Sequence, residues 1–180
     1  AEFAKLLEAA AGQFDAIELH NEGEASDGQP MLSLNLGTEG KPLYFLYGAC
    51  HGSEWEPGYG LLTFARHLAA GTLGDIVDLK KVSIKILPIL NPSGYDRFTR
   101  KNTNGVDLNR QGDFSWDTYS AIIKTKEEEY GAHNARWKGS APFSEPEAIV
   151  YQRICAAPNL HCILDFHGNP TATSNKVGVL

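Results

Sequence analysis

The feature that most constrains the fold is a set of three short apolar segments separated by helical patterns. Segments 42–50, 82–90 and 160–166 carry nearly continuous apolar runs. Such runs are typical of strands covered on both faces, as in the parallel part of an α/β sheet. Apolar residues recur at helical spacing in 58–70 and 144–156. The sequence therefore predicts an α/β sheet with helices on both faces.

The remaining segments complete the predicted order of elements. Apolar spacing indicates helices over 1–14 and 115–130, and alternation indicates half-buried strands over 16–20 and 31–36, joined by a polar loop. The helix over 144–156 is predicted to begin with Ser144 as its N-cap, because Pro146 and Glu147 follow at the favoured positions. With 180 residues and no linker or repeat, residues 1–180 are expected to form a single domain.

Composition and charge exclude several classes of protein. The chain is 42% hydrophobic with a formal net charge of −6, which excludes a disordered chain and gives no electrostatic reason to bind nucleic acid or an anionic membrane. It has no apolar run long enough for a spanning helix, and no signal peptide is visible, so a cytoplasmic location is slightly favoured. The chain has three cysteines, an odd number, and each has apolar neighbours. We therefore expect Cys50, Cys155 and Cys162 to be buried and unpaired.

Chemically active side chains stand at the ends of two predicted strands. His51 and Glu54 follow the strand over 42–50, and His167 follows the strand over 160–166. Ligands bind at the carboxyl ends of the strands in such sheets, and imidazole and carboxylate are the usual donors to catalytic zinc. These three residues are therefore candidate metal ligands with a fourth position open for water. Each one alone also fits a hydrogen-bonded loop residue.

A polar and basic segment follows the third apolar strand. It contains Arg97, Arg100 and Arg110 and begins after Asn91. Arginines near a metal suit an anionic substrate, because the guanidinium pairs with a carboxylate through two hydrogen bonds. A solvated basic loop is the alternative interpretation.

Six segments in order resemble the zinc carboxypeptidase family, the carboxypeptidase A-like metallopeptidases. They are His51-Gly52-Ser53-Glu54-Trp55, Asn91-Pro92-Ser93-Gly94, Arg100-Lys101, Gly105-Val106-Asp107-Leu108-Asn109-Arg110, Ser144-Glu145-Pro146-Glu147 and the late His167. The resemblance extends from about residue 43 to residue 168 and implies a mixed, mostly parallel sheet sandwiched between helices.

The resemblance also implies a function for individual residues. It implies zinc as the cofactor, with His51, Glu54 and His167 as its ligands. It further implies that Arg100 holds the oxyanion, that Asn109 and Arg110 bind the terminal carboxylate of the substrate, and that Asp107 orients a zinc-bound histidine, which we expect to be His51. Asp165 is a rival for this last role, although we expect it to be buried and satisfied by backbone N–H groups.

The sequence departs from the family pattern in three places. Ser53 stands where digestive members often carry an arginine, and Gly168-Asn169-Pro170 replaces their usual Ser-Tyr. The general-base glutamate of the family lies beyond the last residue of this chain, and no acidic residue follows His167. The 180-residue chain is therefore expected to bind zinc and a small carboxylate, to hydrolyse peptides poorly, and to leave one apolar edge or face of its sheet uncovered.

Two other functions fit the same motifs. The branch that contains succinylglutamate desuccinylase and aspartoacylase has a similar His-Gly-x-Glu motif and cleaves small acylated amino acids. A non-catalytic domain that binds a metal and a carboxylate is the second alternative. The expected partner is accordingly a peptide or an acylated amino acid with a free carboxylate.

Overall fold

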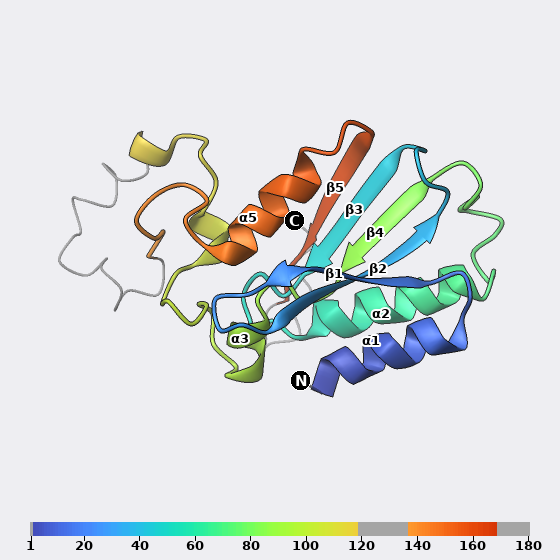
Figure 1. The fold of residues 1–180 in the computed structure, drawn as a ribbon, viewed down its shortest axis with the longest axis horizontal. Helices are drawn as coiled ribbons and strands as arrows, with labels where there is room; N and C mark the ends of the chain where they lie inside the picture. Colours follow the sequence, from blue (N-terminus) through green and yellow to red (C-terminus); the bar gives the residue numbers. More distant parts are fainter. Residues whose placement is uncertain (1, 119–136, 169–180) are drawn as a thin grey trace, which may run out of the picture.

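A five-stranded sheet forms the centre of the computed structural model, which describes residues 2–118 and 137–168 (Figure 1). The spatial order is β1-β2-β4-β3-β5, with bounds Glu18–Glu24 (β1), Pro30–Gly37 (β2), Leu43–Gly48 (β3), Ser83–Leu87 (β4) and Leu160–Phe166 (β5). β3 is parallel to β4 and β5, whereas β2 is antiparallel to β1 and β4. The predicted mixed sheet is confirmed, with its parallel part limited to β4, β3 and β5.

Helices cover both faces of this sheet, as expected. α1 (Glu2–Gln13) and α2 (Glu56–Ala69) lie on one face and α5 (Pro146–Cys155) lies on the other (Figure 1). Side chains alternate along β3: Leu46 packs with the helices α1 and α2, whereas Phe45 and Tyr47 pack toward α5. Because β3 is covered on both faces, its apolar run is continuous.

The position of β5 differs from expectation. It is the outermost strand of the described sheet, and Ile163, Leu164 and Phe166 are 37%, 43% and 39% exposed. The prediction that 160–166 is a strand is confirmed, but the prediction that it is buried is wrong, because no described strand pairs with its outer edge. Among the described residues, this apolar strand has no paired neighbour on its outer edge, in line with the expected uncovered sheet edge.

Several local expectations need correction. α5 begins at Pro146 with Glu145 as its N-cap, so the assignment of Ser144 as the cap is wrong. The Ser144 hydroxyl instead lies 3.2 Å from the Glu145 carboxylate. All three cysteines are free as predicted, but only Cys50 is buried, whereas Cys155 and Cys162 are half-buried.

Two further sequence predictions concern helices. Most of the helix predicted over 115–130 lies outside the described residues. Among the residues that the structure describes, no helix is both long and apolar enough to cross a membrane.

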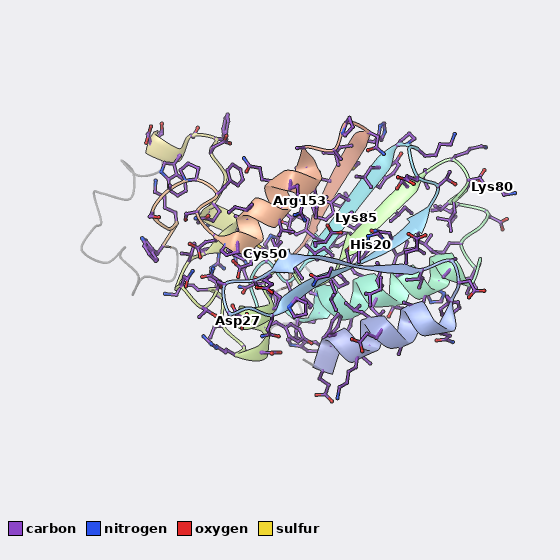
Figure 2. All side chains as sticks on the ribbon, in the orientation of Figure 1. His20, Asp27, Cys50, Lys80, Lys85 and Arg153 are labelled. Carbon is purple, nitrogen blue, oxygen red and sulfur yellow. The ribbon has the colours of Figure 1, made fainter. Side chains whose placement is uncertain are left out.

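A charged cluster ties α5 to the antiparallel part of the sheet. Glu22 of β1 accepts hydrogen bonds from Lys85 of β4 and Ser33 of β2, and its carboxylate lies 3.4 Å from Arg153 of α5 (Figure 2). Burial alone would raise the pKa of Glu22, but the hydrogen bonds and positive charges of its partners outweigh burial and lower this pKa.

Candidate metal site

The loop after β3 brings two of the proposed ligands together. β3 ends at Gly48, and Ala49 adopts a left-handed conformation with φ of 48°. The backbone N–H of Glu54 then donates to the His51 carbonyl at 3.0 Å, which closes a tight turn directly before α2. This turn places the side chains of His51 and Glu54 next to each other.

His167, at the end of β5, completes the cluster. Nδ1 of His51 lies 2.8 Å from Glu54 Oε1, and Nδ1 of His167 lies 2.8 Å from Glu54 Oε2. One potential ligand atom from each residue lies within 4.8 Å of the other two. β3 and β5 are adjacent parallel strands, so their carboxyl ends deliver these residues to the same edge of the sheet.

The outer nitrogen of His51 faces a buried carboxylate. His51 Nε2 lies 3.2 Å from Asp107 Oδ1, and Arg100 Nε donates to Asp107 Oδ2 at 2.9 Å. Burial alone would raise the pKa of Asp107, but its hydrogen bond with His51 and the charge of Arg100 outweigh burial and lower this pKa. Asp107 therefore stays ionised and can accept a hydrogen bond from the protonated nitrogen of His51.

The outer nitrogen of His167 faces a second carboxylate. His167 Nε2 lies 2.8 Å from Asp165 Oδ2, and the Asp165 side chain is 28% exposed. The expectation that Asp165 is buried and satisfied by backbone N–H groups is therefore wrong. In the metal-free chain, the hydrogen bond to Asp165 is the main factor that raises the pKa of His167 to about 9, against the opposing effect of burial.

Asn91 is a positioning residue that sequence reasoning missed. It is fully buried, and its Nδ2 lies 3.3 Å from the Cys50 carbonyl and 3.4 Å from the Arg100 carbonyl. Its Oδ1 accepts from the backbone N–H of Gly94 at 2.9 Å, at the start of α3 (Pro92–Asp96). One amide thus holds the loop that carries His51 and the segment that carries Arg100. The available sequence signal was an asparagine directly after a buried strand.

A second polar network connects this region to the start of α5. Asn102 donates to Glu145 at 2.7 Å and lies 3.2 Å from Glu147, and all three side chains are buried. Gln111 Oε1 accepts a hydrogen bond from the backbone N–H of Glu145 at 3.0 Å. The Ser-Glu-Pro-Glu segment therefore supports the loops of the site from behind.

Asn109 lies beside the proposed ligands, whereas Arg110 extends along a neighbouring hollow. Both belong to the short 3-10 helix η1 (Leu108–Arg110), and Asn109 Nδ2 lies 3.4 Å from His167 Nε2. Arg110 donates to the Asn109 carbonyl at 2.7 Å and lines a hollow of about 280 Å³ with Phe114 and Trp116. The substrate-binding roles of Asn109 and Arg110 remain predictions.

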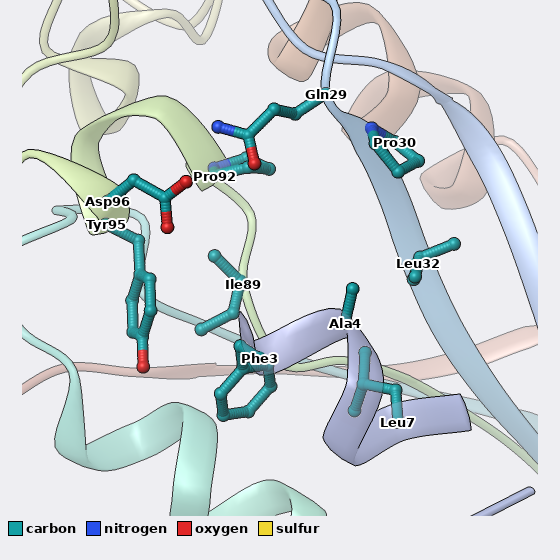
Figure 3. Close-up of a pocket in the computed structure, with 10 residues that line it drawn as sticks. All are labelled: Phe3, Ala4, Leu7, Gln29, Pro30, Leu32, Ile89, Pro92, Tyr95 and Asp96. Atoms are coloured by element: carbon teal, nitrogen blue, oxygen red, sulfur yellow. The ribbon is translucent and has the colours of Figure 1, made fainter. Parts of the chain in front are cut away.

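An apolar hollow of about 270 Å³ lies elsewhere, between α1, β2 and α3 (Figure 3). Phe3, Leu7, Leu32 and Ile89 contribute to its lining. None of the proposed ligands belongs to this lining, so we do not assign it to the site.

The donor set at the strand ends is chemically suited to zinc. Two imidazole nitrogens and a carboxylate are the ligands of many catalytic zinc sites. The immediate surroundings contribute three carboxylates, from Glu54, Asp107 and Asp165, and one guanidinium, from Arg100. With both histidines neutral, as metal ligands must be, the net charge of these groups is −3 + 1 = −2, which a divalent cation neutralises. A mixed α/β sheet with such a cluster at its strand ends defines the class of α/β proteins with a candidate metal site.

Comparison with known proteins specifies the family. The model of the zinc carboxypeptidase family matches residues 4–177, and the chain belongs to this family. It is 28% identical over 162 residues to carboxypeptidase B of Helicoverpa zea, covering 78% of this chain and 36% of that protein. It is 32% identical over 131 residues to carboxypeptidase E of Caenorhabditis elegans, covering 58% of this chain and 28% of that protein.

A solved structure supports the same relationship. The crystal structure of carboxypeptidase A from Helicoverpa armigera matches with a TM-score of 0.74 and 26% identity, covering 89% of this chain and 43% of that one. The chain thus spans less than half of the length of these relatives. The comparisons favour the peptidase branch over the desuccinylase branch considered above. The family uses zinc, and the His51, Glu54 and His167 cluster could hold it.

Proposed function

We propose that the protein containing this chain is a zinc-dependent carboxypeptidase-like hydrolase that cleaves a C-terminal amide bond with a zinc-activated water. The observation that carries the proposal is the convergence of His51, Glu54 and His167 at the ends of two adjacent parallel strands. When bound there, zinc supplies a Lewis acid and lowers the pKa of a water molecule toward about 7.

The chain's own residues prepare this site in three ways. His51 and His167 each present Nδ1 toward a carboxylate oxygen of Glu54, so the three potential ligand atoms lie close together. Asp107 accepts the outer N–H of His51 and so fixes the orientation of that ring. Arg100, held by Asp107, is the group that we assign to oxyanion stabilisation.

Substrate binding in this proposal depends on Asn109 and Arg110. Amide and guanidinium groups both donate hydrogen bonds, and a guanidinium pairs with a carboxylate through two of them. Asn109 is exposed beside His167, which suits a contact with the terminal carboxylate of a bound peptide. The proposed substrate is therefore a peptide with a free C-terminal carboxylate.

The test measures zinc binding and peptide hydrolysis with the full-length protein that carries this chain. Zinc content and release of the C-terminal residue from an N-blocked dipeptide are measured for the wild type, Glu54→Gln and the exposed control Glu39→Gln. We expect Glu54→Gln to lose both properties and Glu39→Gln to retain them.

A second comparison tests the carboxylate contact. In the same protein, Arg110→Ala should slow hydrolysis of the free-acid dipeptide much more than that of its C-terminal amide. Equal losses on both substrates would contradict the role of Arg110. Zinc binding without hydrolysis in the wild type would favour a non-catalytic binding domain.

A further inference from the structure

The two histidines of the site have different partners behind them. Asp107, behind His51, reaches the site from the loop before η1 and is fully buried. Asp165, behind His167, lies near the end of β5, and His167 follows two residues later, directly after the strand. The contact of Asp165 is the shorter one, 2.8 Å against 3.2 Å.

The number of protons on a neutral imidazole determines which atom donates in the hydrogen bond between His167 and Asp165. A neutral imidazole carries one proton, so a ring that presents Nδ1 as a metal ligand must carry its proton on Nε2. Two polar atoms lie near this nitrogen: Asp165 Oδ2 at 2.8 Å and Asn109 Nδ2 at 3.4 Å. An amide nitrogen donates and cannot accept the ring proton, whereas a carboxylate oxygen accepts it.

Asp165 lies next to an aromatic residue of the neighbouring strand. Tyr47 and Asp165 are register partners in the adjacent parallel strands β3 and β5, so their side chains lie on the same face of the sheet. Tyr47 is buried and stacks on Phe45 in the core under α5, with ring centroids 5.3 Å apart. Asp165 therefore stands beside a residue of the packed core of the sheet.

We propose that Asp165 is the positioning residue of His167: it accepts the Nε2 proton, turns Nδ1 toward the metal, and leaves the Asn109 amide available to the carboxylate of the substrate. This inference rests on the proposed function, because it concerns a ligand of the proposed zinc ion. A carboxylate partner also makes the imidazole a stronger donor, and loss of such a partner typically lowers metal affinity about 10–100-fold.

The experiment measures the affinity of the full-length protein for Zn²⁺ alone by competition with a chromophoric chelator. The variants are Asp165→Asn, Tyr47→Phe and the control Asp75→Asn, which lies on an exposed loop. We expect Asp165→Asn to weaken zinc binding about 10–100-fold, Tyr47→Phe to weaken it less, and Asp75→Asn to leave it unchanged. The visible spectrum of the Co²⁺-substituted protein should change with Asp165→Asn at unchanged thermal stability of the metal-free protein.

Three outcomes separate the possibilities. Wild-type protein that binds no zinc refutes the proposed metal site itself. Zinc binding by the wild type with equal affinity in Asp165→Asn overturns the role of Asp165 alone. If Asp165→Asn does not fold, ¹⁵N NMR of histidine-labelled wild-type zinc protein decides. A hydrogen-bonded Nε2 proton on His167 supports the inference, and a proton on Nδ1 overturns it.

Discussion

Replacing Gly52 by alanine tests how closely the metal site depends on the packing of its loop. A Cβ atom at this position would lie 1.9 Å from the carbonyl carbon of Gly94 and 2.2 Å from the backbone nitrogen of Tyr95. Both neighbours are backbone atoms of α3, so rotation of a side chain cannot relieve the clash. Since such contacts are essentially never shorter than 3.0 Å, the loop and α3 must separate by at least 3.0 − 1.9 = 1.1 Å.

This displacement is large compared with the tolerance of a metal site. Ligand distances in zinc sites vary by about 0.2 Å, and Gly52 directly follows His51 in the loop. We therefore expect Gly52→Ala to lower zinc affinity at least about tenfold, comparable to the loss of a partner that orients a ligand. Overpacking should also reduce the free energy of unfolding by about 1–3 kcal/mol.

Gly60→Ala provides the matched control. Gly60 lies on the exposed side of α2, and a Cβ there meets no atom within 4 Å. Alanine should stabilise this helix by about 0.5–1 kcal/mol and leave zinc affinity unchanged. Urea unfolding of the metal-free protein and chelator competition measure the two quantities. Wild-type stability together with wild-type zinc affinity in Gly52→Ala would refute the proposed coupling between α3 and the site.

Three further predictions concern the scaffold. The pKa of Glu22 is lowered in the folded protein, so its interactions stabilise the fold above pH 4.5 and are lost as the pH falls through the lowered value. The free energies of unfolding of wild type and Glu22→Gln, measured with urea at a series of pH values, should therefore converge in acid. Leu164→Lys should reduce self-association of the 180-residue chain in light scattering, whereas Ile149→Lys on the exposed side of α5 should not, because only Leu164 lies on the uncovered edge strand. Asn102→Ala removes a donor from two buried glutamates and should cost about 1–3 kcal/mol in urea unfolding, with a smaller loss for the exposed Asn104→Ala.

The strands that carry the site could be predicted because their signal is local. A strand covered on both faces must be apolar at consecutive positions, and β3 shows this in its own sequence. The positions of His51 and His167 directly after two apolar segments follow from the same pattern. Their meeting at one edge required only that both strands run in the same direction in one sheet.

Other features could not be read from the sequence because they depend on distant partners. Whether the apolar residues of β5 are buried depends on what lies beside it, and the sequence of a strand does not state its neighbours. The start of α5 is a second example. Serine is a favoured N-cap residue, so Ser144 fits the sequence pattern of a cap. The side chain of Gln111, however, accepts a hydrogen bond from the backbone N–H of Glu145, and the helix begins one residue later than predicted. We attribute the shifted N-cap to this hydrogen bond, whose partners Gln111 and Glu145 are 34 residues apart in the sequence.

The partner of His167 shows where local and distant information combine. The two-residue spacing of Asp165 and His167 at the end of the strand predicts that their side chains lie on the same side, and this much follows from the two-residue period of a strand. It does not specify which ring nitrogen turns back toward the carboxylate. That choice follows from Glu54, whose carboxylate lies 2.8 Å from Nδ1, while the carboxylate of Asp165 lies 2.8 Å from Nε2. Because Glu54 lies in the loop after β3 and Asp165 lies in β5, the pairing of β3 with β5 brings both carboxylates to His167.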